Sequence, residues 1–260
     1  MKTNNIKIGS LEVGGDKFCF IAGPCSIESK EHLSNTLDHV IKNGANVLRG
    51  GIYKLRTENG SFQGLGDQAY QFVANLKNEK SIPFITEVTD PRQISDMMDV
   101  ADIFQVGSRN MYNYALLKEL GKVDKPVMLK RGFSATVHEW VNAAKYIEDG
   151  GNKRVILCER GIRGFDDVTR NILDLGTVAH LKQNYHYPVI VDPSHGTGVR
   201  DLVEPMALAA IAAGADGIII ETHPKPDEAM SDGFQSLDFD QLEKLSKKIK
   251  AILPMFGKSL

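Results

Sequence analysis

The sequence contains few cysteines, no recognisable secretory signal and no long apolar run. Its 260 residues include three cysteines, Cys19, Cys25 and Cys158, which are far apart. A sparse and odd-numbered set does not form a disulfide framework, so a reducing, cytoplasmic compartment is predicted. The first 15 residues lack the apolar core of a secretory signal. No apolar run approaches the roughly 20 residues of a membrane span.

An excess of charge of either sign is also lacking. Lysine and arginine total 31 and aspartate and glutamate 33, for a formal net charge of −2. This balance excludes bulk binding to nucleic acid or to an anionic membrane, so any recognition of anions must be local. No low-complexity or Pro/Ser-rich linker divides the chain. We therefore expect one domain over 1–260, with 1–15 as an extension that contains a hairpin at 6–13.

Short apolar runs and amphipathic segments alternate through the rest of the chain. The continuous hydrophobicity of the runs is typical of parallel strands that are buried on both faces. The runs are 18–22, 46–48, 83–88, 102–106, 126–129, 154–158, 187–191 and 217–220. The predicted helices are 29–43, 68–77, 91–98, 114–120, 137–148, 168–183, 202–213 and 239–252. A repeat of about 30 residues predicts an α/β fold, the (β/α)₈ or TIM barrel, with a doubly wound open sheet as the alternative.

Cationic side chains follow several of the predicted strands. In a barrel, the carboxyl ends of the strands carry the functional groups, so these cations are predicted to converge. Convergent cations repel one another unless an anion binds, and a phosphorylated, carboxylated small molecule would satisfy them. The alternative is ion pairing with Glu87, Glu159 and Asp192, which also stand at strand ends. The cations are Arg49, Lys54, Arg109, Lys130 and Arg160.

A second set of polar residues follows the first, seventh and eighth predicted strands. Closure of a barrel makes these strands neighbours, so their side chains can reach one centre. A thiolate, an imidazole and two carboxylates suit a borderline divalent transition ion. Taken singly, they have ordinary alternatives, such as a core cysteine and a helix-capping or loop histidine. The set is Cys25, His195, Glu221 and Asp232.

The other histidines are less informative. His223 competes as a metal ligand, but the adjacent Pro224 indicates a rigid loop. The remaining histidines fall on predicted helices or loops and are expected to face solvent. They are His32, His39, His138, His180 and His186.

Several longer motifs occur in a fixed order along nearly the whole chain. They are Ala22–Glu28 (AGPCSIE), Leu48–Gly66, Gly107–Asn110, Leu129–Ser134 (LKRGFS), Cys158–Arg163 (CERGIR), Val191–Gly198 (VDPSHGTG) and Asp232–Leu237 (DGFQSL). With these motifs the chain resembles the 3-deoxy-D-arabino-heptulosonate 7-phosphate (DAHP) synthases. The similarity is greatest to the compact type I subgroup, which is related to the 3-deoxy-D-manno-octulosonate 8-phosphate (KDO8P) synthases.

The resemblance implies a transferase with a (β/α)₈ barrel, 3-deoxy-7-phosphoheptulonate synthase. Such an enzyme condenses phosphoenolpyruvate with erythrose 4-phosphate and releases phosphate, the first step of the shikimate pathway to aromatic amino acids. The resemblance also implies a cytoplasmic homotetramer or homodimer. One divalent ion of the Mn, Fe, Co or Zn type would be held by Cys25, His195, Glu221 and Asp232.

The same resemblance assigns roles to the cationic residues. Arg49, Arg109, Lys130 and Arg160 would hold the carboxylate and phosphate of phosphoenolpyruvate. Contacts to the phosphosugar would come from Lys54, Arg56 and Thr57. The catalytic set is then Lys54, as a candidate for proton transfer, together with Cys25 and His195.

The sugar-binding loop departs from the family pattern. Leu55 replaces the proline of the Lys-Pro-Arg-Thr motif, and Glu58-Asn59-Gly60 replaces Ser-Pro-Tyr. Gly164 stands where threonine is usual. Loss of the proline frees φ in the loop, so the identity of the sugar depends on this segment. The alternatives are a KDO8P synthase-like enzyme that uses arabinose 5-phosphate and a non-catalytic barrel that binds phosphosugars.

Overall fold

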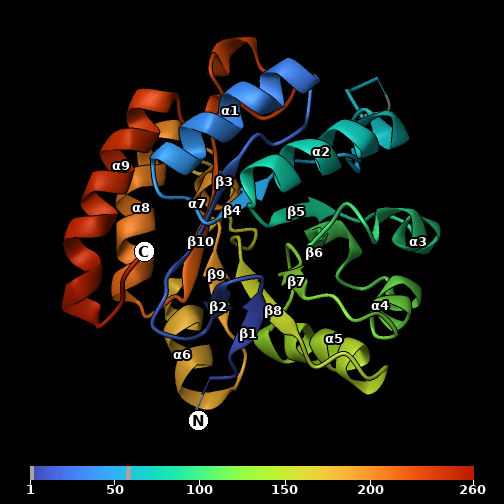
Figure 1. Ribbon diagram of the computed structural model, residues 1–260. Coiled ribbons are helices and arrows are strands. Elements are labelled where there is room, and N and C mark those ends of the chain that lie inside the picture. The colour runs from blue at the N-terminus through green and yellow to red at the C-terminus, as the bar shows by residue number, and fades with distance from the viewer. Residues whose placement is uncertain (1–2, 57–59) are drawn as a thin grey trace.

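The computed structural model describes residues 3–56 and 60–260, and its centre is a closed barrel of parallel strands (Figure 1). The barrel has the order β10-β3-β4-β5-β6-β7-β8-β9, which confirms the predicted (β/α)₈ architecture. The two short strands β1 and β2 pair antiparallel, as expected for a hairpin at 6–13. The strands are β1 Ile6–Ile8, β2 Leu11–Val13, β3 Cys19–Gly23, β4 Val47–Arg49, β5 Phe84–Glu87, β6 Ile103–Val106, β7 Val127–Lys130, β8 Val155–Glu159, β9 Val189–Val191 and β10 Gly217–Glu221.

Helices surround the barrel (Figure 1). The α-helices are α1 Lys30–Lys42, α2 Tyr70–Lys80, α3 Ile94–Met97, α4 Tyr114–Leu120, α5 Val137–Asp149, α6 Leu175–Asn184, α7 Pro193–Thr197, α8 Arg200–Ala212 and α9 Phe239–Ile252. The 3₁₀ helices are η1 Gly66–Ala69, η2 Pro91–Gln93, η3 Ser108–Asn110, η4 Pro226–Glu228, η5 Gly233–Gln235 and η6 Leu253–Phe256. Within the described ranges, every helix is too short or too polar to cross a membrane.

Side-chain caps fix where several helices begin. Ser29 accepts a hydrogen bond from the His32 backbone N–H at 3.0 Å, so α1 begins directly after it, as the sequence predicts. Thr136 and Glu139 form a reciprocal capping box at the start of α5. Such caps satisfy the backbone N–H groups that have no partner within the helix. The caps therefore determine where each strand-end loop stops.

The predicted helix over 168–183 is wrong in its first half, because α6 begins at Leu175. The backbone N–H groups of Arg170 and Asn171 donate to the carbonyl groups of Thr197 and Gly196, at 2.7 and 3.1 Å. Ile172 also forms a bridge to Ile162. These bonds fasten the segment to the loop after β8 and to α7, a short helix that is not among the predicted ones. Tertiary hydrogen bonds thus override an amphipathic pattern.

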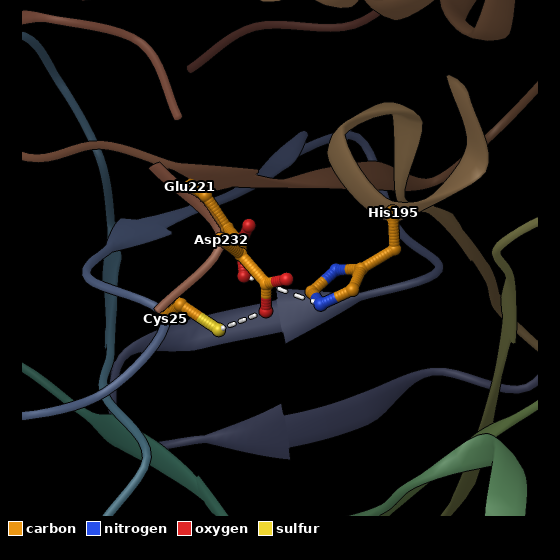
Figure 2. Close-up of side chains that lie close together, drawn as sticks. All are labelled: Cys25, His195, Glu221 and Asp232. Atoms are coloured by element: carbon orange, nitrogen blue, oxygen red, sulfur yellow. Dashed lines mark hydrogen bonds and ion pairs between the residues drawn. The ribbon is translucent and has the colours of Figure 1, made fainter. Parts of the chain in front are cut away.

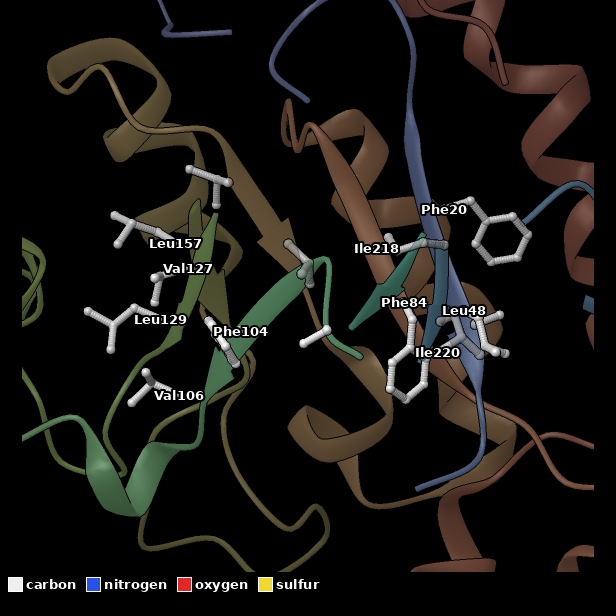
Figure 3. Close-up of a cluster of buried hydrophobic side chains, with 14 of the residues drawn as sticks. Phe20, Leu48, Phe84, Phe104, Val106, Val127, Leu129, Leu157, Ile218 and Ile220 are labelled. Atoms are coloured by element: carbon white, nitrogen blue, oxygen red, sulfur yellow. The ribbon is translucent and has the colours of Figure 1, made fainter. Parts of the chain in front are cut away.

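Each barrel strand points its side chains alternately inward and outward. The outward row packs between sheet and helices and includes Phe20, Leu48 and Phe104 (Figure 3). The inward row begins with apolar residues such as Val47 and Ile85, which belong to a separate buried cluster. In most of the strands the inward row becomes polar two residues further along, as from Val47 to Arg49 in β4 and from Ile219 to Glu221 in β10. This change of polarity produces a charged layer at the carboxyl ends of the strands.

The β1–β2 hairpin covers the opposite end of the barrel. Its apolar residues Ile6, Ile8, Leu11 and Val13 are buried in the same cluster as the inward-facing residues of the barrel strands. In Figure 1 the hairpin lies across the strands near the N-terminus. The apolar floor of the barrel is therefore shielded from water by a segment outside the eight repeats.

We expect Gly23→Ala to destabilise the protein by about 2–5 kcal/mol. Gly23 ends β3 with φ +148°, and a Cβ there would lie 2.1 Å from the carbonyl oxygen of Arg49. Gly257→Ala is the matched control, since Gly257 has φ +68° but its added Cβ meets no atom within 4 Å among the described residues beyond its chain neighbours. The control should lose about 1 kcal/mol. Urea unfolding measures both, and equal losses would contradict the predicted backbone clash.

Candidate active site

The polar ends of the strands surround a cavity of about 220 Å³. Six of its lining residues are cations and two are carboxylates, so the cavity favours anionic occupants. The cations are Lys54, Arg56, Arg109, Lys130, Arg160 and Arg170, and the carboxylates are Glu87 and Asp232. Of the five cations predicted to converge, four line this cavity.

The four predicted metal-type ligands point toward one another (Figure 2). One potential ligand atom from each of Cys25, His195, Glu221 and Asp232 lies within 4.8 Å of the others. The Cys25 Sγ donates to Asp232 Oδ2 at 3.0 Å, and His195 Nε2 lies 3.2 Å from Glu221 Oε1. The residues come from the segments after β3, β9 and β10, which adjoin in the closed barrel. The structure therefore brings together all four residues.

The orientation of His195 leaves a lone pair directed at a carboxylate. Asp192 caps α7 and accepts from His195 Nδ1 at 2.8 Å, which assigns the proton of the neutral ring to Nδ1. Burial lowers the pKa of His195 despite the nearby Asp192 and Glu221. Nε2 and Glu221 Oε1 are then two acceptors 3.2 Å apart. Tetrahedral ligands with bonds of about 2 Å lie roughly 3.3 Å apart, so this spacing suits a cation between them.

Cys25 is surrounded by charges of both signs. Burial raises the pKa of its thiol to about 12, and Glu221 and Asp232 act in the same direction against Lys54 and Arg49. Lys54 Nζ lies 3.0 Å from Cys25 Sγ. Burial alone would lower the pKa of Lys54, but Cys25, Glu87 and Glu221 raise it above its ordinary value. Lys54 is therefore an ammonium group beside the ligand set.

Arg49 is one of the predicted cations that pair with an acid. Its Nη1 lies 3.2 Å from Glu221 Oε1, and both side chains are buried. Its Nη2 also donates to the carbonyl oxygen of Cys25 at 3.5 Å. The expected convergence of the five cations on an anion is therefore only partly seen, because Arg49 forms an ion pair within the protein. The partner is Glu221, which was not among the acids predicted for this role.

Lys130 and Arg160 occupy the other side of the cavity. Lys130 Nζ pairs with Asp192 Oδ2 at 2.6 Å, as the ion-pairing alternative predicted. Glu159, in contrast, pairs with Arg131 at 2.8 Å and leaves Arg160 to the cavity. Burial lowers the pKa of Arg160 to about 10, so it remains charged near neutral pH. Within the described residues, its buried Nη1 has no hydrogen-bond partner.

Sequence reasoning missed three lining residues. Gln105 follows Ile103 in the inward row of β6, so the alternation could have revealed it. Phe133 lies under the guanidinium groups of Arg109, Arg160 and Arg163, at 5.4, 4.8 and 5.3 Å from its ring centroid. Such contacts hold the arginines in place by cation–π attraction.

The third lining residue that sequence reasoning missed is Arg170, whose Nη1 lies 3.6 Å from Asp232 Oδ1. It was hidden because its segment was predicted to be helical. The predicted sugar contacts are only partly described: Arg56 lines the cavity, with Nη1 3.8 Å from Asp232 Oδ2, but Thr57 lies outside the described residues.

The prediction that His32 faces solvent is wrong. Both ring nitrogens of His32 are buried and lack a hydrogen-bond partner across the part of the chain that is described. The ring lies against His223, with 4.4 Å between centroids. Burial, followed by the repulsion of His223, lowers the pKa of His32 to about 4. His32 is therefore uncharged at neutral pH.

A closed parallel barrel with a cationic cavity and a set of metal-type ligands at its carboxyl end defines a (β/α)₈-barrel enzyme. Residues 2–255 match the DAHP synthetase I family. The chain belongs to this family. The match extends over nearly all of the chain and includes each of the eight barrel strands.

Individual relatives agree with this assignment. The chain is 44% identical to the phospho-2-dehydro-3-deoxyheptonate aldolase of Thermotoga maritima, over 97% of this chain and 75% of that protein. It is 32% identical to the 2-dehydro-3-deoxyphosphooctonate aldolase of Geobacter sulfurreducens, over 96% of this chain and 98% of that protein. The match to the octulosonate enzyme is thus weaker, although it spans as much of this chain.

Two solved structures from Thermotoga maritima are also similar. The crystal structure of its DAHP synthase superposes with a TM-score of 0.96 at 43% identity, over 99% of this chain and 76% of that chain. A truncated form of that synthase gives a TM-score of 0.92 at 41% identity, over 99% and 95%.

The burial of His32 predicts a measurable acid sensitivity. The unfolded chain binds a proton at this site near pH 6.5, whereas the folded protein binds it only near pH 4. Stability is therefore lost as the pH falls from about 6.5 to about 4. His32→Leu should reduce this loss, while the same change at the exposed His138 should not. Thermal unfolding at pH 7 and pH 5 tests this, and identical pH dependence in both variants would contradict it.

Proposed function

We propose that this protein condenses phosphoenolpyruvate with erythrose 4-phosphate to form DAHP and inorganic phosphate. The observation that carries the proposal is a cavity that is lined by six cations and also by His195 and Asp232 of the metal-type ligand set. Two phosphorylated anions require the first, and activation of an aldehyde requires the second. Membership of the DAHP synthetase I family supports the choice of reaction.

Phosphoenolpyruvate is assigned to the side of the cavity formed by Arg109, Lys130 and Arg160. Guanidinium groups bind carboxylate and phosphate in a bidentate manner, and Arg160 lines this region with a buried donor that has no hydrogen-bond partner among the described residues. Phe133 holds Arg109 and Arg160 in place. Fixed cations in a water-poor cavity also stabilise the charge that develops on the departing phosphate. Arg49 is assigned to the metal-type ligand set instead, where its positive charge offsets the negative charge of Glu221.

A divalent ion fits between Cys25, His195, Glu221 and Asp232. Two observations support this assignment. His195 Nε2 and Glu221 Oε1 are two acceptors 3.2 Å apart, and the buried Oε1 has no hydrogen bond among the described residues. When bound, the ion supplies Lewis-acid polarisation of the aldehyde oxygen. The mixed sulfur, nitrogen and oxygen set accepts Mn, Fe, Co or Zn.

The chain's own residues then orient the substrates and move protons. Carbon 3 of phosphoenolpyruvate bonds to the aldehyde carbon, water adds at carbon 2, and the bond from carbon 2 to the phosphate oxygen breaks, which leaves a ketone at carbon 2 and inorganic phosphate. The water loses both protons: one balances the proton that the aldehyde oxygen takes up, and the other leaves with the phosphate. The aldehyde oxygen takes up a proton and becomes a hydroxyl group. Lys54 is the candidate to give that proton, because its Nζ lies 3.0 Å from Cys25 Sγ beside the ligand set and its raised pKa keeps it protonated.

The sugar phosphate is assigned to the side of the cavity lined by Arg56 and Ser61. Leu55 is 39% exposed at this position, where the family pattern has proline. The Lys-x-Arg-Thr and Ser-Phe-Gln-Gly residues around it favour erythrose 4-phosphate over arabinose 5-phosphate. Assembly into two or four copies stays a prediction.

The reaction is tested by following the loss of phosphoenolpyruvate with each sugar phosphate. We expect turnover with erythrose 4-phosphate, little with arabinose 5-phosphate, and loss of turnover with a chelator that a divalent ion reverses. Turnover with arabinose 5-phosphate alone would overturn the choice of sugar. Absence of turnover with both sugars would favour a phosphosugar-binding barrel, and turnover that resists the chelator would remove the metal.

Asp192→Asn should weaken metal binding by roughly 10- to 100-fold. An asparagine amide beside His195 Nδ1 favours the tautomer with the proton on Nε2, which removes the lone pair that faces Glu221. The matched control is Asp124→Asn, at a side chain that is 93% exposed. Equilibrium dialysis of the metal-free proteins against Zn²⁺ measures the affinity. Equal affinity of Asp192→Asn and wild type would contradict the assignment of His195.

A further inference from the structure

Glu28 connects two loops on the rim of the barrel. It lies between β3 and α1, and its Oε1 accepts from the backbone N–H of Met230 at 2.8 Å. Its Oε2 lies 3.3 Å from His223 Nε2. The side chains of Glu28 and His223 are only 17% and 8% exposed. The contact to His223 is therefore partly shielded from water, whereas the contact to Met230 lies at the surface.

The hydrogen bonds of His223 determine its tautomer. Its Nδ1 accepts from the backbone N–H of Lys225 at 3.0 Å, so the proton of the neutral ring is on Nε2. Nε2 thus donates to Glu28. Glu28, His32 and His223 have ligand atoms within 4.8 Å of one another, but this tautomer leaves His223 no free lone pair for an ion. The group is a hydrogen-bonded clamp and not a second metal centre.

The clamp connects the segments that carry three of the four metal-type ligands. Glu28 is three residues after Cys25, His223 is two residues after Glu221, and Met230 is two residues before Asp232. Among the described residues, Glu28 forms its hydrogen bonds with Met230 and His223 and not with these ligands. Its two hydrogen bonds instead fix the backbones from which they project.

The segment around Asp232 has particular need of such support. Asp232 has φ +52°, in the left-handed region that is unfavourable for residues other than glycine. A strained conformation persists only where its surroundings hold it. The Glu28 contact to Met230 holds one side of this residue, and Arg200 Nη2 donates to the Gly233 carbonyl at 2.8 Å on the other.

We propose that Glu28 and His223 are positioning residues that hold Cys25, Glu221 and Asp232 at the spacing a divalent ion requires. The inference rests on the metal site of the proposed function and adds two residues that set its affinity from outside the ligand set. Loss of the clamp should release the three backbones from one another. The ion must then order them on binding, and its affinity falls.

The test measures Co²⁺ binding by the metal-free protein through the thiolate-to-cobalt absorption band, which reports on Cys25. Glu28→Gln removes one of the two acceptors of the clamp. His223→Asn keeps an acceptor for the Lys225 N–H but cannot reach Glu28. His223→Gln loses the acceptor for the Lys225 N–H but keeps the contact to Glu28, because its longer side chain brings an amide N–H to that position. Glu31→Gln is the matched control, at an exposed glutamate in the first turn of α1.

Glu28→Gln and His223→Asn should each bind Co²⁺ about tenfold or more weakly, with His223→Gln and Glu31→Gln within about threefold of wild type. Circular dichroism and thermal unfolding of the metal-free proteins check that each variant folds. If Glu28→Gln does not fold, the comparison of His223→Asn with His223→Gln decides.

Wild-type affinity in Glu28→Gln and His223→Asn would overturn the clamp, as would equal weakening by His223→Asn and His223→Gln. If the wild-type protein itself shows no thiolate-to-cobalt band, the proposed metal site is wrong. The clamp proposal, which rests on that site, is then wrong as well. Failure of the clamp alone leaves the band of the wild type intact, so the two failures are distinguishable.

Discussion

The alternation of side chains along the barrel strands is the constraint on which the site depends. A strand that is buried on both faces must present every second residue to the interior. Val47 and Arg49 share that inward row in β4, and Ile219 and Glu221 share it in β10. The alternation itself therefore brings the charged side chains together. It does so wherever the inward row changes from apolar to polar residues at the same height in neighbouring strands.

Gathered charges of one sign would destabilise the barrel, and the structure offsets most of them locally. Arg49 opposes Glu221, and Lys130 opposes Asp192. Arg160 is less completely offset and has its guanidinium over Phe133. Buried ion pairs contribute little net stability because desolvation is costly, so their value here is in orientation. The groups left with unsatisfied bonding capacity are those that a substrate or ion can satisfy.

Much of this arrangement could be predicted from the sequence, because strand order and strand ends follow from pattern. Cys25, His195, Glu221 and Asp232 were grouped correctly since closure of a barrel makes their strands neighbours. The environment of His32 was not predictable, because its burial depends on contact with His223, far along the chain. Arg170 was missed because its segment is amphipathic yet bonded to α7. Local pattern thus determined which residues reach the site, and long-range contacts determined their neighbours.

The hairpin that covers the amino end of the barrel has an electrical consequence. Its four apolar side chains exclude water beneath the charged layer, so the cations rest on a floor of low polarizability. Field lines from such a layer are weakly screened below and emerge chiefly through the opposite mouth. An anion inside the cavity is therefore attracted more strongly by the cations that no carboxylate offsets. A short extension outside the cavity thus strengthens the electrostatics within it.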